Sequence, residues 1–281
     1  NNEEIIKLKS NIQTNSDNYY FALGKAYEDT NQFDLSARNY LKGNFTKKKD
    51  SKYVLSEFKI LTDSIYSFFD SFDFDKFDIS YKSEKKIIFI CGMPRSGSTL
   101  TEQIISAHKD VNATGENNYL SKIIINNYCK NVMLESHKIL NDLNLRKNYI
   151  AKEYLKNFLS VKNSYKIFTD KTYQNFLWIG FIRIFFPNSI VINCVRNPKD
   201  VCFSIFKNTF NDSGMDWAYD QNDIATYYNI YSEMIKFWNK IIPNFIVNLD
   251  YDLLITNPES EIKNLINNCE LNWDDNCLNH H

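Results

Sequence analysis

The segment that most constrains the fold is "KKIIFICGMPRSGST", residues 85–99. Its first half is a short, continuous run of apolar residues, which is typical of a strand buried on both faces in a parallel sheet. Its second half is a glycine-rich turn, and a helix is predicted to begin near Ser98. Backbone N–H groups converge in such a turn, and the helix adds the positive end of its dipole. The segment therefore predicts a loop that binds a phosphate-like anion.

The rest of the chain alternates between strand-like and helix-like segments. Three further strands are predicted at residues 164–171, 188–197 and 244–255. Helical patterns cover residues 174–186, 198–210, 224–242 and 258–269. Alternation of this kind is typical of an α/β domain, whose ligands bind at the carboxyl ends of the parallel strands. The predicted fold is therefore an α/β domain with a P-loop-like parallel sheet flanked by helices.

The first part of the chain is predicted to form two helices joined by a short turn. Its apolar and small residues recur at helical spacing: Leu23, Gly24 and Tyr27, then Phe33, Ala37 and Tyr40. This pattern resembles one tetratricopeptide unit, and an ordinary amphipathic helix pair is the alternative. We therefore expect a small helical, tetratricopeptide-like region with its connector at residues 1–83, followed by the α/β domain at residues 84–281.

Charge and cysteine content narrow the range of partners. The formal net charge is -1 at pH 7, so we expect no long-range attraction to nucleic acid or to an anionic membrane. The six cysteines show no C-x-x-C pairing and the four histidines show no metal-ligand spacing, so we expect no metal and a reducing compartment. No apolar run reaches transmembrane length. The expected location is the cytoplasm.

The glycine loop differs from a nucleotide-hydrolysing loop at one position. A Walker loop reads G-x-x-x-x-G-K-[ST], and here Gly92 and Gly97 keep the glycine spacing while Ser98 replaces the lysine. That lysine neutralises the β- and γ-phosphates of a nucleoside triphosphate. Arg95 supplies a cation from inside the loop instead. Its planar guanidinium suits a group with two acceptor oxygens, such as sulfate or phosphate.

Two other functions stay open on the residues alone. A P-loop nucleotide kinase would need an acidic residue after an apolar strand, and "VNLDYD" at residues 247–252 fits that pattern, although the Walker lysine is absent. A non-catalytic protein-docking module would combine the N-terminal helices with a catalytically inactive α/β domain. That reading requires loss of the glycine loop or of one of two candidate site residues outside it, Arg196 at the end of a predicted strand and Glu116 after Gly115, and all of these are present.

Four motifs follow one another along the chain: PRSGST at 94–99, GE at 115–116, DK at 170–171 and RNPKDVCFS at 196–204. They resemble the sulfotransferases that use 3′-phosphoadenosine-5′-phosphosulfate (PAPS), especially the bacterial branch with a tetratricopeptide region in front, and are similar to tyrosylprotein sulfotransferases. The resemblance covers roughly residues 86–277. Family members continue past "WDDNCLNHH" with a basic segment, so the resemblance implies an incomplete C-terminal end.

The resemblance implies a donor site made of two anion contacts and one ring contact. The 5′-phosphosulfate is expected on the loop residues Arg95, Ser96, Gly97, Ser98 and Thr99. The 3′-phosphate is expected on Arg196 and Ser204, and the adenine near Tyr251. PAPS is the expected co-substrate, adenosine 3′,5′-bisphosphate the expected product, and no metal takes part.

The resemblance also assigns the catalytic residues. Arg95 and Lys171 are expected to stabilise the sulfuryl group, and Glu116 to act as the base for an acceptor hydroxyl. His108 is the rival base, because the small-molecule branch of the family uses a histidine. The acceptor stays open between a protein tyrosine, a glycan and a small molecule. The N-terminal helical region is the candidate contact for a protein partner.

Overall fold

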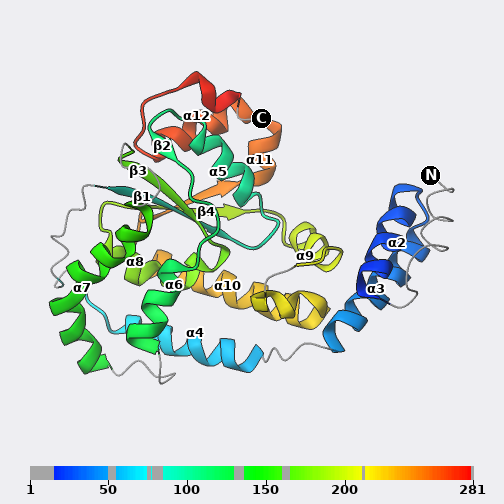
Figure 1. Ribbon diagram of the computed structural model, residues 1–281, viewed down its shortest axis with the longest axis horizontal. Coiled ribbons are helices and arrows are strands. Elements are labelled where there is room, and N and C mark those ends of the chain that lie inside the picture. Colours follow the sequence, from blue (N-terminus) through cyan, green and yellow to red (C-terminus); the bar gives the residue numbers. More distant parts are fainter. Residues whose placement is uncertain are drawn as a thin grey trace. The chain divides into compact units, whose positions relative to one another are not determined.

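A parallel sheet of five strands carries most of the predicted elements (Figure 1). In this computed structural model, the described residues are 16–49, 55–74, 77, 85–129, 136–159, 165–210 and 213–279. The strand order is β2-β3-β1-β4-β5, and all neighbouring strands run parallel. The strands are β1 (Lys86–Gly92), β2 (Val111–Asn112), β3 (Ile167–Lys171), β4 (Ile190–Val195) and β5 (Ile246–Asp250). The predicted α/β fold with a parallel sheet is confirmed.

The prediction of the last strand is correct for its first half only. The sequence predicts a strand over residues 244–255, but β5 ends at Asp250 and the short helix α11 (Tyr251–Thr256) follows. Asp250 stops the strand because its side chain caps this helix: Oδ1 accepts hydrogen bonds from the backbone N–H groups of Asp252 at 2.8 Å and Leu253 at 3.1 Å. The apolar residues after Asp250 therefore belong to a helix.

Alternate residues of the central strand face two separate cores. Ile88 and Ile90 pack in a cluster with α5 (Ser98–Ser106), α12 (Pro258–Asn268) and the 3₁₀ turn η4 (Asp275–Leu278). Phe89 points to the opposite face, where it contacts Tyr154 of α7 (Ser136–Leu159). This alternation is the period of two that a strand imposes on its side chains. Both faces are thus covered, which explains the continuous apolar run in β1.

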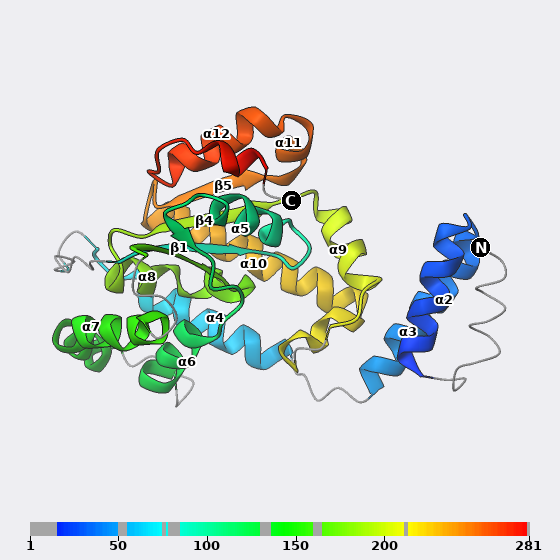
Figure 2. The same cartoon turned by 45° about the horizontal axis from the view of Figure 1, so that its top comes forward.

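Aromatic rings fill the second of these cores. Phe69 of α4 (Leu55–Asp70) makes edge contacts with Phe181 and Trp238, each with ring centroids 5.1 Å apart. These partners lie on α8 (Ile179–Phe185) and α10 (Gln221–Ile241). Figures 1 and 2 agree that α5, α11 and α12 cover one face of the sheet, whereas α8 covers the other. Between β2 and α7 the chain forms α6 (Tyr119–Ile124) and the π-helical turn η1 (Ile125–Cys129), and between β3 and α8 it forms the 3₁₀ turn η2 (Tyr173–Trp178).

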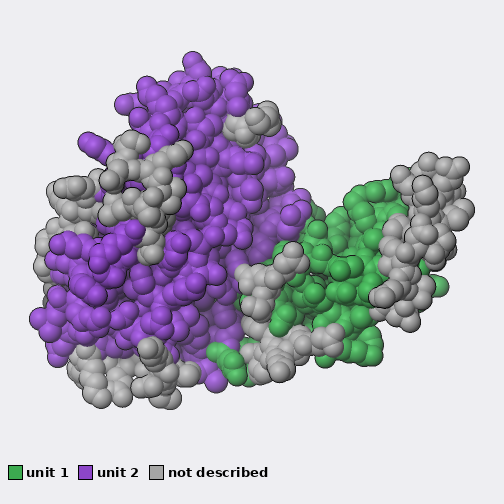
Figure 3. Space-filling view, viewed as in Figure 1, with its two compact units in different colours: residues 1–57, 198–230 green, residues 58–197, 231–281 purple. Residues whose placement is uncertain are grey.

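The chain folds into two compact units (Figure 3). Unit 1 comprises residues 1–57 and 198–230, and unit 2 comprises residues 58–197 and 231–281. The sheet belongs to unit 2. The predicted domain boundary between residues 83 and 84 falls outside the described residues, so it stays a prediction.

Unit 1 is helical. Its helices α2 (Asp17–Asp29) and α3 (Phe33–Lys49) confirm the predicted helix pair. They approach closely at Gly24, where a Cβ atom would lie 2.6 Å from the Tyr40 ring, and Ser36 Oγ donates to Gly24 O at 2.8 Å. The unit also holds α9 (Pro198–Phe206), the 3₁₀ segment η3 (Ser213–Tyr219) and the start of α10. Asn44 Nδ2 joins α3 to α9 by donating to Phe206 O at 2.7 Å.

Candidate active site

The predicted site residues follow the carboxyl ends of adjacent strands. The glycine loop follows β1, Lys171 is the last residue of β3, and Arg196 and Tyr251 come directly after β4 and β5. The strands β1 and β3 are neighbours in the sheet, and the helices that follow them, α5 and α8, cover opposite faces. Ligands of open α/β sheets bind at such a switch point.

The glycine loop has the backbone of an anion cradle. Arg95 and Gly97 adopt left-handed conformations, with φ of 70° and 97°, and Gly97 is the N-cap of α5. The first N–H groups of α5 have no partner within the helix and therefore favour an anion. Ser96 lies between the two and is 1% exposed. Its Oγ is buried and has no hydrogen-bond partner in the described part of the chain.

Tyr251 and Arg196 lie against this loop. A Cβ atom on Gly97 would come 2.3 Å from Tyr251 Cδ2, so the ring packs directly on the glycine. The guanidinium of Arg196 stacks over the same ring, 4.6 Å from its centroid, and Nη1 donates to Arg95 O at 3.2 Å. Arg196 Nε is buried and finds no hydrogen-bond partner among the described residues. The loop and the adjacent Arg196 thus present two buried donors that have no partner among the described residues, Ser96 Oγ and Arg196 Nε.

Lys171 brings a cation to the same edge of the sheet. Its Nζ donates to Glu116 Oε1 at 2.7 Å and lies 3.4 Å from Thr99 Oγ1. The side chain of Lys171 is 9% exposed, whereas that of Glu116 is 71% exposed. A cation fixed by burial therefore meets a carboxylate on the solvent side, next to the first turn of α5.

Asp170, the neighbour of Lys171, is fully buried in a polar network. It accepts hydrogen bonds from Tyr154 OH, from Thr172 Oγ1 at 3.0 Å and from Asn175 Nδ2 at 3.0 Å. Burial raises the pKa of Asp170 to about 6, although these hydrogen bonds act in the opposite direction. The network anchors the end of β3, and with it the backbone of Lys171.

Two other predicted residues are Ser204 and His108. Ser204 belongs to α9 in unit 1, whereas Arg196 is in unit 2, so their shared 3′-phosphate contact stays a prediction. His108 is 2% exposed, and its Nε2 forms a hydrogen bond with Asn272 O at 2.9 Å. The ring of His108 is thus fixed inside unit 2, as expected of a structural residue.

The sequence matches the profile of the sulfotransferase family over residues 88–275. The chain belongs to this family. An uncharacterised protein of Aquifex aeolicus is 31% identical over 270 residues, which are 93% of this chain and 35% of that protein. The protein-tyrosine sulfotransferase of Drosophila melanogaster is 23% identical over 213 residues, which are 72% of this chain and 41% of that protein. The chain therefore spans well under half the length of these two relatives.

A solved sulfotransferase structure shares the fold. The sulfotransferase domain of the Synechococcus PCC 7002 olefin synthase superposes with a TM-score of 0.50 and 19% identity, over 72% of this chain and 79% of that domain. At this identity the likeness concerns the fold alone. Along the described ranges, no helix combines the length and the apolar character needed to span a membrane.

The sequence did not single out Glu102, which forms hydrogen bonds next to this group of residues. Glu102 of α5 is 7% exposed and accepts hydrogen bonds from Gly115 N at 3.1 Å and Thr169 Oγ1 at 2.6 Å. A glutamate on the apolar face of a predicted helix is the signal that would have found it, because carboxylates are rarely buried without a partner.

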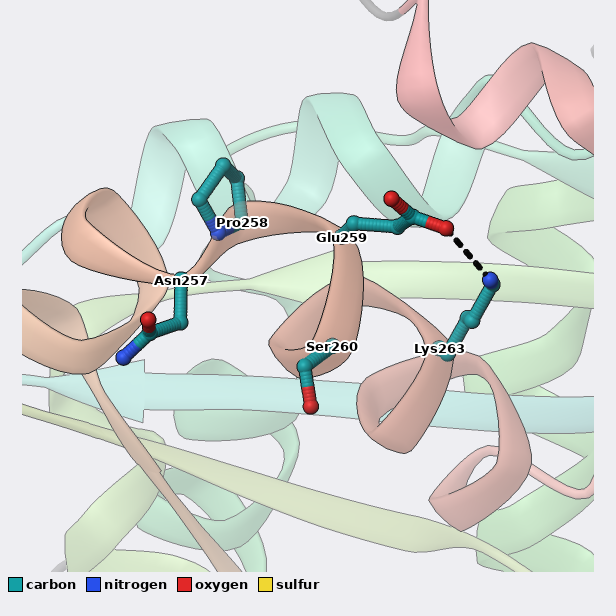
Figure 4. Close-up of a pocket in the computed structure, with 5 residues that line it drawn as sticks. All are labelled: Asn257, Pro258, Glu259, Ser260 and Lys263. Carbon is teal, nitrogen blue, oxygen red and sulfur yellow. Dashed lines mark hydrogen bonds and ion pairs between the residues drawn. The ribbon is translucent and has the colours of Figure 1, made fainter.

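A surface pocket at the start of α12 lies outside this group of residues (Figure 4). It has a volume of about 500 Å³ and is lined by Asn257, Pro258, Glu259, Ser260 and Lys263. Glu259 and Lys263 form an ion pair of 2.6 Å with each other. Their charges are therefore already satisfied, and none of the predicted site residues lines the pocket.

Proposed function

We propose that the protein transfers a sulfuryl group from PAPS to an acceptor hydroxyl. One observation carries the proposal: Lys171 Nζ lies between Glu116 and Thr99, where the helix of a lysine-free phosphate loop begins. A cation, a carboxylate and a phosphate loop at one point are what sulfuryl transfer to a hydroxyl needs. Membership of the sulfotransferase family supports the same reaction.

The residues around the loop fit the donor. Ser96 Oγ and Arg196 Nε are buried donors without a partner in the described ranges, and such groups are costly unless a ligand satisfies them. Arg95, Ser98 and Thr99 would join Ser96 and Gly97 in holding the 5′-phosphosulfate. Arg196 and Ser204 would hold the 3′-phosphate, and Tyr251 would contact the adenine. Bound PAPS would supply an activated sulfuryl group.

Three side chains have separate roles in the transfer step: Lys171, Arg95 and Glu116. Sulfuryl transfer resembles phosphoryl transfer, because charge spreads over equatorial oxygens while the attacking and leaving oxygens stay roughly in line. Lys171 and Arg95 stabilise that charge from fixed positions. Glu116 accepts the proton that the acceptor hydroxyl loses while its oxygen forms a bond to the sulfur. The S–O bond to the donor would break at the same time, and adenosine 3′,5′-bisphosphate would leave with that electron pair.

Protein tyrosine is the first acceptor to test, because several relatives are named protein-tyrosine sulfotransferases. Glycans and small alcohols or phenols complete the panel. The experiment offers PAPS with a labelled sulfuryl group to the protein and to each acceptor class, without added metal. Transfer of label to one class supports the proposal and identifies the acceptor. Absence of transfer to all classes, together with no binding of adenosine 3′,5′-bisphosphate, would refute it.

A further inference from the structure

Glu102 is a buried carboxylate that has no ion pair with a lysine or arginine in the described part of the chain. Within the described ranges its partners are a backbone N–H group, that of Gly115, and a hydroxyl, that of Thr169. Burying a carboxylate without a cation is expensive, and charge-assisted hydrogen bonds offset only part of that cost. An apolar residue would pack on this face of α5 without any such cost. The position is thus explained by the two hydrogen bonds that Glu102 accepts.

The first of these hydrogen bonds fixes the residue before Glu116. Gly115 has a φ of 67°, and no atom lies within 4 Å of the place where its Cβ would be. Glycine is therefore favoured here by the backbone conformation and not by lack of space. Its N–H donates to Glu102, and its carbonyl accepts from Lys171 N at 3.2 Å. Gly115 is held from both sides.

The second hydrogen bond ties the same carboxylate to β3. Thr169 Oγ1 donates to Glu102 Oε1 at 2.6 Å, and the Thr169 carbonyl accepts from Thr114 Oγ1. Lys171 follows two residues later on the same strand. One carboxylate oxygen of α5 thereby joins the loop that carries Glu116 to the strand that carries Lys171.

We propose that Glu102 is a positioning residue, which holds Glu116 at the distance from Lys171 and Thr99 that proton transfer requires. Glu102 acts through Gly115 and touches neither donor nor acceptor. The inference rests on the proposed function, because Glu116 must be the base. Misplacement of a reacting group by 1 Å costs up to about 100-fold in rate. The loss of Glu102 should therefore lower kcat rather than the affinity for the donor.

The test compares Glu102→Ala, Glu102→Gln and Gln103→Ala, the last as an exposed control on the same helix. Both hydrogen bonds end on Oε1, so the amide oxygen of Glu102→Gln retains them. We expect Glu102→Ala to lower kcat by about 10- to 100-fold at unchanged affinity for adenosine 3′,5′-bisphosphate, and the other two variants to stay near wild type.

Two further readouts separate positioning from a general structural role. In a Glu116→Gln background, Glu102→Ala should change kcat less than about twofold, because the base it positions is already gone. Hydrogen exchange of residues 111–118, measured without donor, should accelerate in Glu102→Ala and not in Glu102→Gln or Gln103→Ala. Should Glu102→Ala fail to fold, Thr169→Val removes one of the two hydrogen bonds and takes its place in the cycle.

An equal loss of kcat in both backgrounds, or unaltered exchange and kcat in a folded Glu102→Ala, would overturn the inference. These results are distinct from failure of the proposed function. If the wild type neither binds adenosine 3′,5′-bisphosphate nor transfers a sulfuryl group, the function itself is wrong. If the wild type transfers it and Glu116→Gln is fully active, only the base, and with it the role of Glu102, is refuted.

Discussion

Lys171 and Glu116, which lie 55 residues apart in the chain, form an ion pair of 2.7 Å at the carboxyl edge of the sheet. Burial holds the lysine, whereas the glutamate stands at the solvent side. The two residues therefore differ in exposure: the lysine is buried beside the phosphate loop, and the carboxylate is accessible to an incoming hydroxyl from the solvent.

Replacing this carboxylate should remove the base. We expect Glu116→Gln to keep the fold and the donor affinity and to lower kcat by roughly 10²- to 10⁴-fold, the usual range for general acid–base catalysis. An acidic phenol should show a smaller effect than an alkyl alcohol, because it needs less help to lose its proton. Turnover is measured with one acceptor of each kind.

His108→Ala is the matched comparison. Because His108 is buried and bonded to Asn272 O, its loss should reduce stability more than it reduces turnover per folded molecule. Circular dichroism gives the folded fraction. Collapse of turnover in a folded His108→Ala, with near-normal turnover in Glu116→Gln, would transfer the role of base to His108.

The donor site should recognise the 3′-phosphate. Arg196 Nε is a buried guanidinium donor without a partner among the described residues, and a charged contact left unpaired costs about 2 to 5 kcal/mol. We expect adenosine 3′,5′-bisphosphate to bind at least about tenfold more tightly than ADP or ATP, with no need for Mg²⁺. Isothermal titration calorimetry decides the point, and equal affinities or an absolute Mg²⁺ requirement would contradict the assignment.

Substitutions of the two arginines at the loop, Arg196 and Arg95, should affect different kinetic constants. Arg196→Ala should raise the KM for PAPS, since Arg196 is assigned to the donor's 3′-phosphate and not to the reacting group. Arg95→Ala should lower kcat as well, because Arg95 lies in the loop assigned to the sulfuryl group. Lys152→Ala, which removes one positive charge from an exposed position of α7, is the control for net charge. Identical donor affinity in all three variants would refute the assigned roles.

Asp170 should make the stability depend on pH in an unusual direction. Its pKa is about 6 in the folded protein and about 3.9 in an unfolded chain, so between these values the folded state binds the extra proton. The free energy of unfolding should therefore fall as the pH rises from about 4 to about 6, by an amount on the order of 3 kcal/mol. Below pH 4 the contribution is fully present, and above pH 6 it is lost.

Urea unfolding of the wild type and of Asp170→Asn at several pH values between 4 and 7 tests this contribution. The variant has no titrating group at this position, so the difference in unfolding free energy between the two proteins should change with pH over the same interval. A constant difference would show that Asp170 stays ionised in the folded protein.

Most of the sheet could be predicted from the sequence, because most of its strands coincide with short segments that have a strand-like residue pattern. Residues 85–92 and 188–197 contain short apolar runs, residues 164–171 contain the apolar pair at 167–168, and each of the three segments contains a strand of the structure. The strand β2 has only two residues, too few for any periodicity. The helix α7 was not predicted either, because charged and amide side chains interrupt its buried positions, which include Leu143, Ile150 and Tyr154.

The candidate site could be predicted only as far as its motifs reach. Three of the motifs lie at the carboxyl end of a strand or directly after it, so the fold brings the loop, Lys171 and Arg196 to one edge of the sheet. The sequence does not contain the pairing of Lys171 with Glu116, nor the hydrogen bond from Gly115 to Glu102, because both depend on how loops meet across the sheet. Such contacts follow from tertiary packing and leave no local pattern.

The contact between Tyr251 and Gly97 restricts how this sequence can evolve. A side chain at position 97 would meet both an unfavourable φ of 97° and the Tyr251 ring. A smaller residue at 251 would remove the clash and leave the backbone strain, so no single compensating change rescues the position. Position 97 is therefore restricted to glycine. Position 251 can change only to side chains that still pack against the backbone of Gly97.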